Sequence, residues 1–441
     1  MNDILLSAYG QTSRRPAPVN ALMASLAANF REDVDINLGV GYVNENTIPR
    51  QQILEGVEAV LRRPDRHPFA LNYGAPRGSQ NLIESLRRFH CEMGEDGLTE
   101  ELLDRREIIV GPNGATSLLE SIALVLEPGI VLTSDPMYYI YCHFLERQGF
   151  EVVTVPEDED GMRIDLLEEK IRALGERRQA IRFVYAVSVG NPTSSILSNG
   201  RRRDLVRLVT ELSAELGRKV PLVFDRAYEQ LIHDSQVEPP ESALVHDEAE
   251  LVYEIGTLAK ILAPGLRIGY LIGSGGPFCD ALVQRTSDAG FSAAMINQEV
   301  ASYLLDHFVE EQIARVNQGY REKARQMKGW IEAELGEAVE DCRGGRAGFY
   351  FYLTLDGIET CEGSPFFYFL TRTTGLREVD GPADDRKPCI IYIPGAFCVH
   401  PRGDMVEAGR RQMRLSYGFE EPERIHRALG FMRQAAAFAR G

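Results

Sequence analysis

Lys260, a lysine in apolar surroundings, has a residue type and setting that could support covalent chemistry. It stands between Ala259 and Ile261, shortly after the apolar run 251–253, and a Pro-Gly pair and Arg267 follow it. Lysine is seldom buried unless it is paired or reacting. A desolvated lysine loses proton affinity and becomes an amine nucleophile, the form that attacks an aldehyde. A surface lysine before a turn has the same appearance, so the surrounding elements must decide between the two interpretations.

Short apolar strands alternate with helices along the middle of the chain. Each strand is apolar at successive positions, so both faces of the sheet that they form must be covered. Such an alternation is typical of an α/β fold with a mainly parallel sheet flanked by helices, and ligands bind these sheets at the carboxyl ends of the strands. We expect the strands at residues 107–110, 130–132, 151–155, 183–187, 222–224 and 251–253.

The pattern changes after Phe291. A long helical run over residues 293–335 precedes three further strands, which are separated by helices. The second part of the chain therefore predicts a smaller α+β domain. These three strands are expected at residues 349–353, 389–393 and 412–417.

The change of pattern also suggests how the chain is divided. Residues 1–70 are expected to form an N-terminal segment and part of the small domain, 71–320 the large domain, and 321–441 the C-terminal small domain. Residues 359–388 are rich in Gly, Asp and Thr, and we expect a surface insertion there.

Residues with binding potential follow the strands of the large domain. After the strand at 107–110, a helix begins with Gly114, Ala115 and Thr116. Free backbone N–H groups beside small side chains bind anions there, although an ordinary capped turn looks the same. Tyr138 follows the next strand and is suited to stacking on a flat ring or to core packing. Asn191 lies in a Gly-Asn-Pro-Thr turn, which holds an amide in place or only reverses the chain.

Charged residues follow the later strands. Asp225, with Tyr228 nearby, ends an apolar strand, where a carboxylate is costly unless it is paired with a cation or caps a helix. Thr257 and Arg267 flank Lys260, and Arg414 lies inside an apolar strand of the second domain. An inward arginine binds a carboxylate or phosphate bidentately, or forms a structural ion pair. Together these residues supply an amine, an anion cradle, a stacking ring and a carboxylate, which pyridoxal 5′-phosphate requires.

The chain resembles the pyridoxal-phosphate enzymes of fold type I, and among them the class I and II aminotransferases. Residues 257–269 resemble the family's lysine motif, Ser-x-Ser-Lys-x-x-x-Pro-Gly-x-Arg-x-Gly, and the likeness extends from Asn37 to Phe431. The C-terminal part is similar to the α-aminoadipate/kynurenine aminotransferase branch. Two positions depart from the pattern: Ala259 replaces the usual hydroxyl residue, and Thr116 stands where this branch often has Gln.

The resemblance implies a role for each cofactor-binding residue. Lys260 would form the internal aldimine and later carry the proton, and Asp225 would pair with the pyridine nitrogen. Tyr228 and Asn191 would hydrogen-bond the 3′-oxygen, and Tyr138 would stack on the ring. The phosphate would be held by Gly114, Ala115, Thr116, Thr257 and Arg267.

The resemblance also implies a substrate site and a partner. Arg414, with Asn191 and the backbone near Gly39, would bind the substrate α-carboxylate. Tyr73 would reach the phosphate bound by a neighbouring subunit, which implies a homodimer. The implied reaction transfers an amino group from an α-amino acid to a 2-oxo acid. A lyase, decarboxylase or oxidase on the same scaffold is the alternative, because the fold does not determine the reaction.

Composition restricts the other classes of function. The net charge of -17 argues against nucleic-acid binding, and the segment before Asn37 is too short for the DNA-binding module of a regulator with an aminotransferase-like domain. The 7 Cys form no CxxC pair and the His residues show no ligand spacing, so no metal is expected. No long apolar run or signal-peptide core is present, which predicts a cytoplasmic protein without a membrane span.

Overall fold

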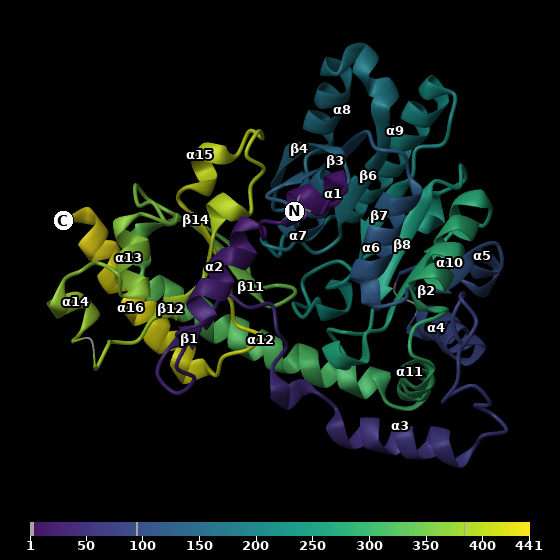
Figure 1. The fold of residues 1–441 in the computed structure, drawn as a ribbon, viewed down its shortest axis with the longest axis horizontal. Helices are drawn as coiled ribbons and strands as arrows, with labels where there is room; N and C mark the ends of the chain where they lie inside the picture. The colour runs from purple at the N-terminus through teal and green to yellow at the C-terminus, as the bar shows by residue number, and fades with distance from the viewer. Residues whose placement is uncertain (1–3, 94–95, 383) are drawn as a thin grey trace.

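The computed structural model describes residues 4–93, 96–382 and 384–441, and Figure 1 shows their arrangement. An eight-stranded sheet forms the larger part of the molecule. Five neighbouring strands are parallel, whereas β9 runs antiparallel to both β2 and β8. In spatial order the strands are β2 (Glu107–Val110), β9 (Gly269–Gly273), β8 (Val252–Thr257), β7 (Leu222–Asp225), β6 (Ile181–Val187), β3 (Ile130–Asp135), β4 (Glu151–Asp158) and β5 (Gly161–Met162).

Helices cover both faces of this sheet because successive strand residues point to opposite sides. Val223 packs in one core cluster, on the side of α6, α7 and α10. Its neighbours Leu222 and Phe224 pack in the other, on the side of α8 and α9. The predicted α/β fold, with a mainly parallel sheet between helices, is confirmed. The covering helices are α6 (Gly114–Val125), α7 (Tyr139–Arg147), α10 (Pro277–Gly290), α8 (Ile164–Ala173) and α9 (Asn199–Leu216).

A second, antiparallel sheet forms the other part of the molecule. Its strand order is β10 (Val339–Gly344), β11 (Tyr350–Leu355), β14 (Gln412–Ser416) and β13 (Ile393–Pro394). Beside it, β1 (Ile36–Asn37) pairs in parallel with β12 (Ile390–Ile391), so the N-terminal segment joins the C-terminal part of the chain. The long helix α12 (Val309–Glu334) runs between the two parts (Figure 1).

The expected surface insertion at residues 359–388 is wrong for its central part. Helix α13 (Pro365–Thr371) buries Phe366 and Leu370 and packs against α16 (Pro422–Arg440). The Gly and Asp residues of this stretch lie on either side of the helix, and their turn signals obscured the run of aromatic residues between them. The remaining short helices of this part are α14 (Arg377–Asp380) and α15 (Val406–Gly409).

Helix α1 (Ala8–Ser13) packs against the large part of the molecule. Tyr9 of α1 contacts Phe144 of α7, with ring centroids 6.0 Å apart. Val19 of α2 is buried in the core cluster on the α7 side. None of the described helices is both long and apolar enough to cross a membrane. The remaining helices are α1 (Ala8–Ser13), α2 (Pro18–Ala27), α3 (Arg50–Arg62), α4 (Gln80–Met93), α5 (Glu100–Asp104) and α11 (Met295–His307).

Candidate active site

Asp225 is the last residue of β7 and lies at the carboxyl end of the parallel strands. It is 6% exposed, and its carboxylate accepts hydrogen bonds from the Tyr185 hydroxyl (2.9 Å) and the Ala227 amide (3.0 Å). Burial raises the pKa of Asp225, and the charge of Lys260 opposes that rise. Within the described residues, no cation forms an ion pair with this carboxylate. The site therefore presents a buried acceptor in need of a positively charged partner.

Lys260 lies in the turn after β8 and points towards the same space. Its Nζ donates to the Gly41 carbonyl at 3.2 Å and stands over the rings of Tyr228 (5.3 Å) and Phe349 (5.6 Å). Burial, followed by the positive charges of Arg414 and Arg267, lowers the pKa of Lys260 to about 8. At pH 7 about a tenth of the amine is therefore unprotonated, the form that a nucleophile requires, and this fraction grows as the pH rises towards 8.

Arg414 enters the site from β14 of the second sheet. It is 2% exposed, and its Nη1 and Nη2 donate to Asn191 Oδ1 (2.7 Å) and the Gly39 carbonyl (2.5 Å). Its Nε is buried without a partner among the described residues. The Gly39 amide is already engaged, because it donates to Asn37 Oδ1 at 3.0 Å. Arg414 and Asn191 therefore meet across the two sheets, with a guanidinium whose hydrogen bonding is incomplete.

The start of α6 and the side chain of Arg267 form a second cationic feature. Asn113, the residue before the helix, provides no side-chain cap, and Gly114 adopts a left-handed backbone with φ +75°. Arg267 donates from Nε to Asn113 Oδ1 (3.1 Å) and from Nη2 to the Asn113 carbonyl (3.0 Å). A Cβ added to Gly269 would lie 2.1 Å from the Ala115 amide nitrogen. The close approach permitted by that glycine places free N–H groups and a guanidinium side by side, as an anion site needs.

Three of the other predicted site residues lie near the carboxyl ends of the strands, and the fourth lies on the surface. Thr257 ends β8 and donates to the Ile268 carbonyl at 2.8 Å, and Thr116 is in the first turn of α6. Tyr138 precedes α7, where burial and then the nearby Asp225 raise its pKa. Tyr73 is 73% exposed, and its ring lies 5.1 Å from that of Phe291. Tyr73 is thus a surface residue of its own chain.

Two tyrosines of the site were missed by sequence reasoning. Tyr185, which holds Asp225, pairs in register with Val223, and the two-residue period of strands puts both on the Asp225 face. The alternation within each strand could be seen in the sequence, but the register that pairs Tyr185 with Val223 comes from the structure. Tyr350 of β11 gave no signal in the sequence, because its hydroxyl reaches Tyr228 (3.0 Å) from the other sheet.

Comparisons with known proteins show what the chain is similar to in sequence and fold. The 2-aminoadipate transaminase of Thermus thermophilus is 27% identical over 320 residues, which cover 71% of this chain and 74% of that protein. An uncharacterised HTH-type transcriptional regulator of Bacillus subtilis, YisV, is 25% identical over 352 residues, or 78% of this chain; the match spans 66% of the regulator's length. The solved structure of a kynurenine aminotransferase from Pyrococcus horikoshii has a TM-score of 0.79 at 23% identity, covering 98% of this chain and 99% of that chain.

A family model decides the relationship. Residues 35–366, well over half of the chain, match the family described as aminotransferase class I and II. The matched region contains Asp225 and Lys260 together with the whole eight-stranded sheet that positions them. The chain belongs to the class I and II aminotransferase family.

Proposed function

We propose that this protein is a pyridoxal-phosphate-dependent aminotransferase that moves an amino group from an α-amino acid to a 2-oxo acid. The observation that carries the proposal is the buried Asp225 carboxylate, which lacks a cationic partner among the described residues and faces the amine of Lys260. A protonated pyridine nitrogen is the partner that such a carboxylate would accept. The kynurenine aminotransferase of similar fold was solved with PMP.

The described residues fit the cofactor at both of its ends. The uncapped start of α6, with Arg267 beside it, suits the phosphate. Asp225 suits the ring nitrogen, and Lys260 is placed to bond the aldehyde carbon. When bound, pyridoxal phosphate supplies a ring that accepts the electrons left on the substrate Cα. Tyr228 and Asn191 would hold its 3′-oxygen, Tyr138 would cover the ring, and Gly114, Ala115, Thr116 and Thr257 would complete the phosphate site.

The chain's own residues would then carry the proton and fix the substrate. Asp225 would keep the proton on the ring nitrogen, which maintains the ring's affinity for electrons. Lys260 Nζ, poised by a pKa of about 8, would take the proton from the substrate Cα and return one to the cofactor. Arg414 would bind the α-carboxylate through a guanidinium that now contacts Asn191 and Gly39.

We also propose that the active protein is a homodimer. Aromatic and aliphatic side chains gather where Tyr73 and Phe291 touch, and both of these rings are largely exposed on a single chain. Large apolar side chains left exposed together indicate an interface. Tyr73 would then act in the partner's phosphate site. The exposed members of this patch are Phe69, Leu71, Tyr73 and Phe291.

A single half-reaction tests the proposed activity. The pyridoxal-phosphate form is mixed with one amino acid at a time, without any oxo acid, and absorbance and products are followed. We expect stoichiometric formation of pyridoxamine phosphate and the matching 2-oxo acid with at least one amino acid. Release of ammonia or CO₂ without pyridoxamine phosphate would instead identify a lyase, decarboxylase or oxidase.

The similarity to YisV favours a second candidate function, that of a ligand-sensing domain of a transcriptional regulator. Such a domain would bind the cofactor and an amino acid without turnover. The same screen separates the two functions. Binding of the cofactor and of an amino acid with no conversion of any of the amino acids would favour the sensing domain.

A further inference from the structure

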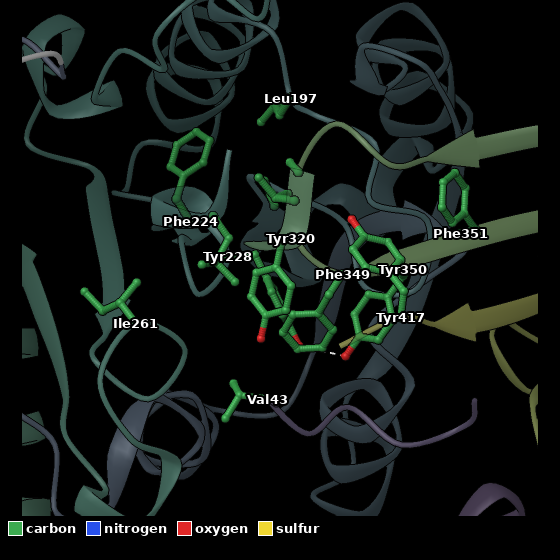
Figure 2. Packing of buried hydrophobic residues seen from close by; sticks show 14 of the residues in the cluster. Val43, Leu197, Phe224, Tyr228, Ile261, Tyr320, Phe349, Tyr350, Phe351 and Tyr417 are labelled. Carbon is green, nitrogen blue, oxygen red and sulfur yellow. Dashed lines mark hydrogen bonds between the residues drawn. The ribbon is translucent and has the colours of Figure 1, made fainter. Parts of the chain in front are cut away.

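Tyr350 touches two of the proposed functional residues, Tyr228 and Arg414, but belongs to neither of their elements. It is 1% exposed on β11, and its hydroxyl lies 3.0 Å from the Tyr228 hydroxyl. Its ring lies under the Arg414 guanidinium, with the central carbon 4.3 Å from the ring centroid. Figure 2 shows Tyr228, Phe349 and Tyr350 at the centre of the buried aromatic cluster.

The backbone at Gly41, which contacts Lys260, leaves room for the Tyr350 hydroxyl. A Cβ on Gly41 would lie 2.6 Å from the Tyr350 oxygen, so any other residue would displace the phenol. The carbonyl of the same glycine accepts the hydrogen bond from Lys260 Nζ. Tyr350 is therefore confined between Gly41 and Tyr228 at a position adjoining the reactive amine.

The Tyr228 hydroxyl has a single proton to donate. If that proton goes to the cofactor's 3′-oxygen, the Tyr228 oxygen needs a donor of its own, and Tyr350 is its one hydrogen-bond partner among the described residues. A phenol that accepts a hydrogen bond becomes a stronger donor, because neighbouring bonds in a buried chain polarise one another. Burial raises the pKa of Tyr228, which keeps Tyr228 protonated and able to donate.

The ring of Tyr350 acts on the opposite side, at Arg414. Planar guanidinium groups stack on aromatic faces, and this contact fixes the plane in which Nη1 and Nη2 point. Those two nitrogens contact Asn191 and Gly39, the positions at which a carboxylate would be bound. The orientation of Arg414, on β14, thus depends on the ring of Tyr350, on the neighbouring strand β11.

We propose that Tyr350 is a positioning residue with two separable actions. Its hydroxyl directs the Tyr228 proton to the cofactor's 3′-oxygen, and its ring holds Arg414 in the plane that binds the substrate carboxylate. The inference rests on the proposed function, because both actions require pyridoxal phosphate bound to Lys260 and an α-amino acid as substrate.

Two substitutions separate the actions. Tyr350→Phe removes only the hydroxyl, whereas Tyr350→Leu also removes the aromatic face under Arg414. Tyr392→Phe is the matched control, because Tyr392 is equally buried and its hydroxyl donates to the Thr360 carbonyl, away from the site. The measurements are the pH titration of the absorbance of the lysine-bound cofactor, kcat and KM for the amino acid, and the melting temperature.

Tyr350→Phe is expected to raise the titration midpoint by about 0.4 to 1 pH unit, because a weaker hydrogen bond to the 3′-oxygen disfavours the form in which that oxygen is fully anionic. Its KM should stay within about twofold of the parent. Tyr350→Leu should show a similar midpoint and a KM at least about tenfold higher, from the loss of the stacked face. Tyr392→Phe should change neither quantity.

The result that overturns the role of Tyr350 alone is a midpoint shift in Tyr228→Phe but none in Tyr350→Phe. Equal KM values for the Phe and Leu variants would overturn the action on Arg414. If Tyr228→Phe also leaves the midpoint unchanged, the placement of the cofactor fails, and the proposal for Tyr350 fails with it.

Discussion

Lys260 and Asp225 are both buried at positions that disfavour the charged form of the side chain. Burial lowers the pKa of Lys260 to about 8 and raises the pKa of Asp225. Each shift costs folding free energy in the cofactor-free protein, since the charged form is the one that burial disfavours. Under the proposed function, a cofactor that bonded the amine and paired with the carboxylate would remove both costs, which would link stability to function at these two residues.

The depressed pKa of Lys260 predicts a pH-dependent stability. The unfolded lysine binds its proton up to about pH 10.5, whereas the folded one loses it near pH 8, so the stability of the cofactor-free protein should rise with pH between these values. Below about pH 8 the penalty is complete. Lys260→Met should therefore stabilise the cofactor-free protein by about 1–3 kcal/mol at pH 7. The gap, measured by urea unfolding at several pH values, should close above pH 10.5; a constant gap would contradict the assigned pKa.

Asp225→Asn tests the carboxylate. The amide keeps the shape but cannot hold a proton on a ring nitrogen, so kcat should fall by about 10²–10³-fold while the cofactor still binds. Tyr185→Phe is the graded comparison. It removes one hydrogen bond to the carboxylate, and a loss of about tenfold is expected. A kcat for Asp225→Asn within a few-fold of the parent would exclude the proposed pairing.

At the scale of single elements, the sequence predicted the strands better than their directions. The strand that ends at Asp225 and the strand that precedes Lys260 were expected within a few residues of β7 and β8, because buried parallel strands are apolar at every position. Strand β9 was not predicted, since Gly269 and Gly273 give it the composition of a loop. Those glycines have a physical reason: a side chain at Gly269 would collide with the start of α6.

Under the proposed function, the start of α6 and the side chain of Arg267 hold the phosphate of the cofactor. Arg267→Gln removes one charge-assisted contact and should weaken pyridoxal-phosphate binding by about 10–100-fold, with little change in melting temperature of the cofactor-free protein. The dissociation constant is measured by absorbance titration. Arg177→Gln is the control, because Arg177 is an exposed arginine paired with Glu151. Equal losses of affinity in the two variants would show a general effect of charge instead of a phosphate contact.

At the scale of the whole molecule, the site is assembled from segments that could be identified in the sequence, but the contacts between these segments could not be predicted from it. Arg414 meets Asn191 only because the second sheet packs against the first, and Tyr350 reaches Tyr228 in the same way. Local periodicity places residues on a face of one element and carries no information about contacts between sheets. The apolar strand around Arg414 singled out that arginine in the sequence and the family resemblance gave it a role, whereas Tyr350 could be recognised only from the structure.

The proposed dimer makes a quantitative prediction about mixing. Tyr73→Asp and Lys260→Ala should each be inactive as homodimers, if Tyr73 serves the partner's site. After unfolding and refolding together in equal amounts, half of the dimers are hybrids, and each hybrid has one intact site. The mixture should regain about a quarter of the parent activity. No recovery, with hybrid formation verified by mass spectrometry, would place Tyr73 outside the partner's site.

The most direct test of the central claim is the identity of the lysine that binds the cofactor. The protein is incubated with pyridoxal phosphate, reduced with borohydride, digested and mapped by mass spectrometry. The structure predicts one phosphopyridoxyl group per chain, on Lys260, and its loss when an α-amino acid is added before reduction. A modified lysine elsewhere, or an undiminished adduct in Lys260→Ala, would contradict the proposed catalytic role of Lys260.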